Sequence, residues 1–112
     1  MFESKGDAMR FFDNLYLGAN VPNVSKIKRQ ILNRSLFVKA YVIALANGED
    51  QLDIFDAKVL RQSYYRSNPR TIVAIASDYD EAVELVIRIT QDALRQGYEG
   101  RIKDFLIDME TK

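Results

Sequence analysis

Residues 71–94 read TIVAIASDYDEAVELVIRITQDAL, and this stretch holds the two clearest secondary-structure signals in the chain. Its first six residues, Thr71–Ala76, form a short apolar run that predicts a strand. Ser77 or Asp78 can then cap a helix, whose wide apolar face continues as far as Leu94 and borders a charged stripe. A strand that leads directly into an amphipathic helix indicates a domain containing both sheet and helix.

Two more strands are expected before this stretch. Residues 36–46 are β-branched, aromatic and nearly continuous, and residues 51–57 have the pattern of a returning strand. The aromatic residues expected in the core are Phe11, Phe12, Phe37, Tyr41 and Phe105. Asn47 and Gly48, which lie between them, are a strong hairpin signal. Residues 58–66 could continue as a strand or coil into a short helix. The strand order also stays open, because a meander places the returning strand at the centre, whereas the order second-first-third places the most apolar strand there.

Three further helices are expected towards the two ends of the chain. Apolar residues recur at helical spacing in residues 5–17 and again in residues 24–34, where Asn23 or Ser25 can provide the cap. Residues 100–109 form a last amphipathic segment.

The whole pattern predicts an α+β fold in one domain, residues 1–112. We expect a three-stranded, mainly antiparallel sheet, with two N-terminal and two C-terminal helices packed mostly on one face. A chain of 112 residues with 47% hydrophobic and 29% charged residues has the composition of an ordinary globular domain.

The missing residue types exclude several chemistries. The chain contains neither Cys nor His, so thiol nucleophiles, thiolate zinc sites and a Ser-His-Asp triad cannot be built. The acidic cluster Asp78, Asp80, Glu81 and Glu84 falls mainly in the first turn of a helix, where acidic side chains are favoured by capping and by the helix dipole. We therefore expect no enzyme, no cofactor and no metal site.

The N-terminal residues include acids and no long apolar stretch, which argues against a signal peptide. The longest apolar run, residues 40–46, is far shorter than the roughly 20 residues of a membrane span. A soluble, cytoplasmic protein without membrane contact is the simplest expectation.

Charge is distributed unevenly along a chain whose 16 basic and 16 acidic residues balance. Residues 14–77 carry nine bases and four acids, whereas residues 78–112 carry five bases and nine acids. The basic part could bind phosphate, and its tyrosines could stack on unpaired bases. Alternatively, the acidic helices neutralise it, within the monomer or across a dimer. The candidate residues for anion or nucleic-acid binding are Lys26, Lys28, Arg29, Arg34, Tyr64, Tyr65, Arg66 and Arg70.

Three segments, residues 41–46, 51–55 and 72–82, carry a resemblance to a known group of proteins. They read YVIALA, QLDIF and IVAIASDYDEA, and the pattern resembles short uncharacterised α+β proteins of Gram-positive gut bacteria. The resemblance would cover roughly residues 35–110 and implies no activity.

These features predict a small non-enzymatic protein that associates with itself or with a protein partner. The alternative is a weak nucleic-acid-binding accessory protein that uses the basic part, residues 14–77.

Overall fold

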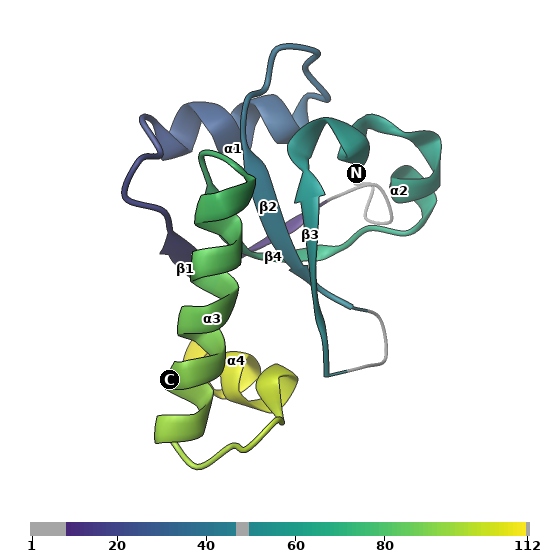
Figure 1. Ribbon diagram of the computed structural model, residues 1–112. Helices are drawn as coiled ribbons and strands as arrows, with labels where there is room; N and C mark the ends of the chain where they lie inside the picture. The colour runs from purple at the N-terminus through teal and green to yellow at the C-terminus, as the bar shows by residue number, and fades with distance from the viewer. Residues whose placement is uncertain (1–8, 47–49, 112) are drawn as a thin grey trace.

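The computed structural model describes residues 9–46 and 50–111 of the chain. Its elements follow one another as strand, helix, two strands, two short helices, strand and two helices (Figure 1). Their bounds are β1 Arg10–Leu17, α1 Val24–Leu32, β2 Tyr41–Leu45, β3 Leu52–Asp56, the 3-10 helix η2 Ala57–Arg61, α2 Ser63–Ser67, β4 Thr71–Ala76, α3 Tyr79–Arg95 and α4 Ile102–Thr111.

The four strands form one mixed sheet in the order β1-β4-β2-β3, so the predicted three-stranded sheet lacked one strand, β1. β2 is antiparallel to both β3 and β4, whereas β1 and β4 are parallel. The α+β class is therefore confirmed. Of the two strand orders left open by the sequence, the structure has the one in which the most apolar hairpin strand lies between the other two predicted strands. The physical reason is burial, because Val42, Ile43 and Ala44 of β2 are completely inaccessible to solvent.

Helices cover both faces of this sheet, so the prediction of helices mostly on one face is wrong. On one face, α1 and η2 contribute Ile27, Ile31 and Leu60, which pack around residues such as Ile72 of β4. On the other face, α3 and α4 contribute apolar residues that pack around neighbours such as Val73. β4 contributes to both cores, with Ile72 and Ile75 in the first and Val73, Ala74 and Ala76 in the second. All five of these residues are fully buried.

The first strand is the clearest departure from the sequence prediction. Residues 10–17 form an edge strand rather than a helix, and residues 5–8 lie outside the described residues. Phe11 and Leu15 pack with the α1 core, while Phe12 and Tyr16 pack with the α3 core. This spacing of four accompanies an irregularity in the pairing of β1 with β4. Phe11 pairs with Ile72 and Tyr16 pairs with Ala74, so β1 advances five residues while β4 advances two. The extra residues of a bulged strand can thus imitate helical periodicity.

The remaining predictions are mostly confirmed. α1 is capped by Asn23, whose side chain accepts a hydrogen bond from the Lys26 N–H, and α3 is capped by Asp78. The ambiguous residues 58–66 are helical apart from Gln62, which lies between η2 and α2. The strand predicted for residues 36–46 is shorter, since β2 begins at Tyr41. The Asn47-Gly48 turn lies outside the described residues, although β2 and β3 pair as a hairpin would.

Glu81 links the carboxyl ends of the parallel pair β1 and β4. It belongs to the acidic cluster predicted at the start of the helix, yet only 8% of it is accessible. Its carboxylate accepts hydrogen bonds from the backbone N–H of Ser77 at 2.7 Å and of Asn20 at 3.0 Å. A Cβ at Gly18 would overlap this carboxylate, so the close approach requires glycine there. The loop after β1 is thereby fixed to the start of α3.

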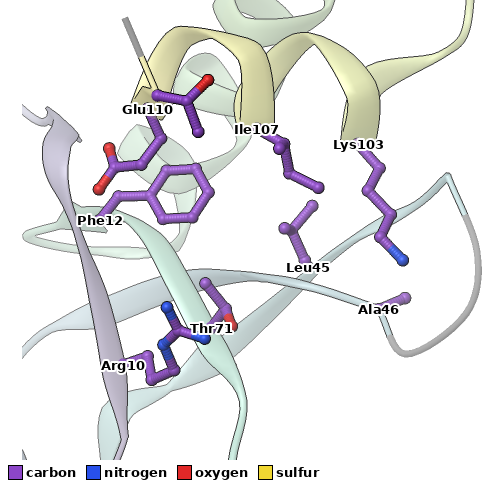
Figure 2. Close-up of a pocket in the computed structure, with 9 residues that line it drawn as sticks. Arg10, Phe12, Leu45, Ala46, Thr71, Lys103, Ile107 and Glu110 are labelled. Carbon is purple, nitrogen blue, oxygen red and sulfur yellow. The ribbon is translucent and has the colours of Figure 1, made fainter.

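A solvent-exposed cavity of about 370 Å³ remains between α4 and the sheet (Figure 2). It lies where β1 and β4 begin and where β2 ends, with Phe12, Leu45 and Ile107 among its lining residues. Glu110 of α4, which also lines the cavity, joins this helix to β1 by accepting hydrogen bonds from the backbone N–H of Asp13 and Asn14.

The two backbone donors determine the ionisation of Glu81. Burial raises the pKa of its carboxyl group, but the hydrogen bonds from Ser77 and Asn20 outweigh burial and hold the pKa below its usual value of 4.5. A carboxyl group with a lowered pKa stabilises the fold above the unfolded-state pKa, and this contribution is lost as the pH falls through the folded-state pKa.

We predict that Glu81→Gln lowers the free energy of unfolding by about 1–3 kcal/mol near pH 7, because a neutral amide replaces a doubly hydrogen-bonded carboxylate. The difference from the wild type should shrink at acidic pH well below 4.5, as the pH falls through the lowered pKa of the folded-state carboxyl group. Denaturant unfolding at both pH values measures this. Glu84→Gln, on the same helix and exposed, should change stability by less than about 0.5 kcal/mol. An equal Glu81→Gln deficit at both pH values contradicts the account.

Candidate nucleic-acid interface

One helical layer of the molecule contains basic residues and no acidic ones. This basic layer consists of residues 20–40 and 57–70, which include α1, the loop after it, η2 and α2. Apolar residues of α1, this loop and η2 lie in one core cluster against the same face of the sheet. The layer's nine basic residues are Lys26, Lys28, Arg29, Arg34, Lys39, Lys58, Arg61, Arg66 and Arg70.

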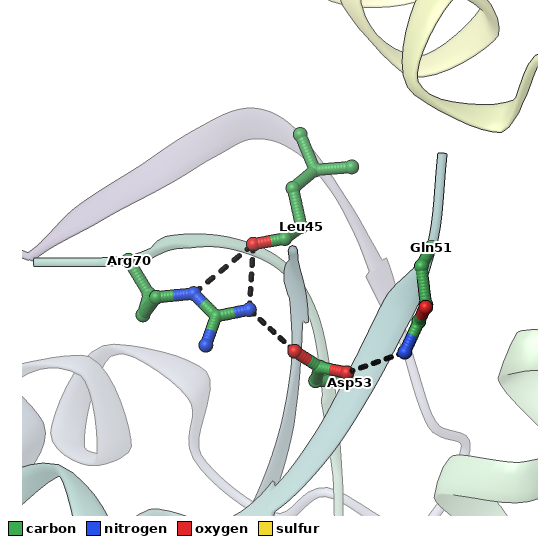
Figure 3. Close-up of polar contacts among 4 residues, drawn as sticks. All are labelled: Leu45, Gln51, Asp53 and Arg70. Atoms are coloured by element: carbon green, nitrogen blue, oxygen red, sulfur yellow. Dashed lines mark hydrogen bonds and ion pairs between the residues drawn. The ribbon is translucent and has the colours of Figure 1, made fainter. Parts of the chain in front are cut away.

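Arg70 belongs to the fold rather than to the surface of this layer (Figure 3). Only 8% of the residue is accessible. Its guanidinium donates to the Leu45 carbonyl oxygen at 3.1 and 2.7 Å and forms an ion pair with Asp53 at 2.7 Å. It also lies 5.1 Å from the ring centre of Phe55. These contacts occupy Arg70 in joining β4 to the β2–β3 hairpin, so it is not available for an external anion.

The other eight cations have no carboxylate within 4.0 Å among the residues that the structure describes. Lys26, Arg29 and Arg66, all predicted candidates, are exposed, as are Lys39, Lys58 and Arg61. Lys28 and Arg34 are partly buried. Two of these side chains donate to backbone carbonyls, Lys58 to Val38 at 2.8 Å and Arg61 to Arg34 at 3.2 Å, which leaves their charges unneutralised.

Arg34 occupies an unusual position in this layer. Its backbone has a positive φ of 54°, just after α1 ends, which is uncommon for a residue other than glycine. Its Nε is buried and has no hydrogen-bond partner among the described residues. The sequence singled Arg34 out as an anion ligand, and the structure directs part of its guanidinium into the protein instead.

Two aromatic side chains of the basic layer face solvent. Phe37 is 78% exposed and Tyr64 is 61% exposed. Tyr65, the other predicted stacking residue, is partly buried, with its ring edge-on to Phe55 and Tyr64 at 5.6 and 5.0 Å. Tyr64 therefore remains a candidate for stacking, whereas Tyr65 supports it from the core.

A shallow groove beside α1 brings cations and an aromatic ring together. It has a volume of about 270 Å³, and its lining includes Lys26 and Gln30 of α1 and Phe37 and Lys39 of the following loop. Sequence reasoning placed Phe37 in the core and left Lys39 out of the candidate set. The available signal was the acid-free run that contains both residues.

The opposite layer of the molecule is acidic. The described residues 78–111, which include α3 and α4, carry nine acids and four bases. Their ion pairs are internal, Arg95 with Asp92 and Arg101 with Asp104. No described ion pair joins this layer to the basic layer, so the neutralisation proposed within one molecule is not made by direct contact.

Within residues 9–46 and 50–111, no cluster of three or more acidic side chains is arranged to hold a metal ion. None of the helices described there is long and apolar enough to cross a membrane. Comparisons with protein families, with curated proteins and with solved structures find no match to this chain. The resemblance to proteins of gut bacteria thus stays a prediction.

We predict that Arg70→Met lowers the free energy of unfolding by about 3 kcal/mol, because it leaves Asp53 without its cation and the Leu45 carbonyl without its donors. This value is at the lower end of the destabilisation caused by breaking a buried ion pair, because the Asp53 side chain is 31% exposed and water can hydrate it once Arg70 is removed. Arg66→Met, at an exposed site of the same layer, is the matched control and should change stability little. Denaturant unfolding compares the two variants, and similar values for both contradict a structural role for Arg70.

Proposed function

We propose that this protein binds single-stranded nucleic acid through its basic layer. The observation that carries the proposal is the segregation of charge, since two segments with nine bases and no acid form one face of the molecule. Eight of those bases have no carboxylate partner among the described residues, and six of the eight are exposed, so that their charge is available to phosphates. Contacts of this kind release counterions and supply most of the affinity for a nucleic-acid backbone.

The exposed aromatic rings favour a single strand over a duplex. Phe37 and Tyr64 present faces on which an unpaired base can stack, and bases inside a duplex already stack on one another. Lys26 and Lys39 lie in the same groove as Phe37, so a base on the ring and its flanking phosphates would meet complementary groups. Stacking is tolerant of sequence, and we therefore expect little base specificity.

The neutral total charge does not oppose this function, because none of the 16 acidic residues lies in the basic layer and nine of them lie in the opposite one. The molecule extends 23 Å even along its shortest axis, compared with a Debye length of about 8 Å at physiological ionic strength. Surface charges on the two layers are thus largely screened from each other. The far layer still lowers long-range attraction, which supports weak rather than tight binding.

We expect Lys26→Glu combined with Lys39→Glu to weaken binding of fluorescein-labelled oligothymidylate. The slope of the logarithm of the binding constant against the logarithm of the salt concentration should become less steep by about 1.4, because two phosphate contacts are lost. Phe37→Ala should reduce the binding free energy by about 1–3 kcal/mol without changing this slope, because it removes a stacking contact and no charge. Fluorescence anisotropy over a salt series measures both effects.

The matched control is Arg101→Glu, which reverses a charge with 58% side-chain exposure on the opposite layer. It should leave the affinity and the salt dependence nearly unchanged. Equal losses for Arg101→Glu and for the Lys26/Lys39 variant, or no binding at low salt, reject the proposed function.

Self-association through α3 is a second candidate, favoured by a separate observation. Tyr79, Ile87 and Leu94 are 54%, 52% and 54% exposed and recur at helical spacing on the outer side of α3. Exposed acids, including Glu84, lie in the first half of the helix, and Arg88 lies in the second half. A second copy with its α3 antiparallel would cover the apolar stripe and place acids beside bases.

Ile87→Glu should lower the weight-average mass measured by analytical ultracentrifugation at high protein concentration, because it places a charge at the centre of the stripe. Leu36→Glu, at an apolar site of the basic layer that is 59% exposed, should not affect association. A wild-type protein that is monomeric at every concentration excludes this second candidate.

A further inference from the structure

The cavity between α4 and the sheet has the features of a small-molecule site. Its volume of about 370 Å³ falls within the range of roughly 300–1,000 Å³ found for ligand pockets. Phe12 of β1, Leu45 of β2 and Ile107 of α4 provide an apolar lining from three elements (Figure 2). Its walls therefore belong to the folded core and not to a surface loop alone.

Two cations border this apolar lining from different elements. Arg10 lies on β1 opposite Thr71 of β4, and Figure 2 shows its guanidinium next to the Thr71 side chain. Lys103 of α4 borders the cavity from the other side, near Ala46. Neither cation has a carboxylate within 4.0 Å among the described residues.

Two described carboxylates near the cavity, those of Glu110 and Asp50, accept hydrogen bonds from the backbone. Glu110 lines the cavity, but its two oxygens accept hydrogen bonds from the backbone N–H of Asp13 at 2.6 Å and of Asn14 at 3.2 Å. Asp50 accepts a hydrogen bond from the backbone N–H of Lys103 at 3.0 Å and so caps α4. Within the described part of the chain, the charges of Arg10 and Lys103 therefore border an apolar space without a paired anion.

We propose that this cavity binds a small amphipathic anion, an aromatic or aliphatic body that carries a carboxylate or sulfonate group. The apolar body contacts Phe12, Leu45 and Ile107, and the anionic group pairs with Arg10, with the Thr71 hydroxyl as an additional donor. Lys103 contributes attraction from the opposite side. The site lies against the acidic layer, on the sheet face opposite the basic layer, so it is separate from the proposed nucleic-acid interface.

The test uses two probes of nearly the same shape. One is 8-anilinonaphthalene-1-sulfonate, and the other is N-phenyl-1-naphthylamine, which lacks the sulfonate. We expect saturable binding of the sulfonate probe at one site, with a rise in its fluorescence, and clearly weaker binding of the neutral probe. Arg10→Gln should weaken binding of the sulfonate probe about tenfold, the effect of losing one charge-assisted hydrogen bond, and should leave the neutral probe unaffected.

Two further variants make the location of the site testable. Ile107→Trp fills the cavity from a position that is 40% exposed and should reduce binding of both probes, with circular dichroism confirming that the fold is retained. Lys26→Glu combined with Lys39→Glu, in the groove of the basic layer, should leave binding of both probes unchanged. The inference is overturned by equal binding of the two probes, by sulfonate binding lost only in the Lys26/Lys39 variant, or by the absence of saturable binding.

Discussion

The burial of β4 on both faces is the constraint on which the rest of the structure depends. Five consecutive residues, Ile72–Ala76, are fully buried, so the chain must supply a helical cover for each face of the sheet. The segments before β4 supply one cover and the segments after it supply the other. A parallel edge strand, β1, shields one side of β4, and the β2–β3 hairpin shields the other.

Because of this arrangement, the uneven distribution of charge along the sequence becomes a difference in charge between the two faces of the molecule. Basic residues are concentrated before β4 and acidic residues after it, so the sheet comes to lie between a basic layer and an acidic layer. A monomer with no net charge thereby presents two faces of opposite charge. For such a molecule, net charge is a poor guide to its partners, and the distribution of charge is the informative quantity.

The parts of the fold that were predictable from the sequence are those determined locally. α3 follows from its cap and its apolar face, and β4 follows from its continuous apolar run. β1 was not predictable in this way, because its spacing arises from an irregular pairing with β4, about 60 residues away in the sequence. Its apolar side chains are divided between two cores, and this division can be recognised only when helices are known to cover both faces of the sheet.

The candidate site shows the same division between local and long-range information. Lys26 and Arg29 follow from the charge pattern alone, because exposed cations on a helix need no distant partner. The role of Arg70 cannot be predicted from the charge pattern, because it depends on contacts with Asp53 and the Leu45 carbonyl, which only the folded sheet brings close to it.

Phe37 was assigned to the wrong environment for a related reason. The alternation of side chains around it is real, with Val38 and Ala40 accessible to 1% and 4%. It is the smaller side chains that face the core, because α1 and η2 cover that side of the segment. Alternation shows which residues share a face, but packing decides which face is buried.

The most direct test of a basic layer that binds single strands is a titration of isotopically labelled protein with unlabelled oligothymidylate, followed by two-dimensional NMR of the backbone amides. The account predicts that the shifting signals fall within residues 20–40 and 57–70, with α3 and α4 unaffected. Shifts concentrated in α3 and α4, or no shifts at low salt, would contradict it.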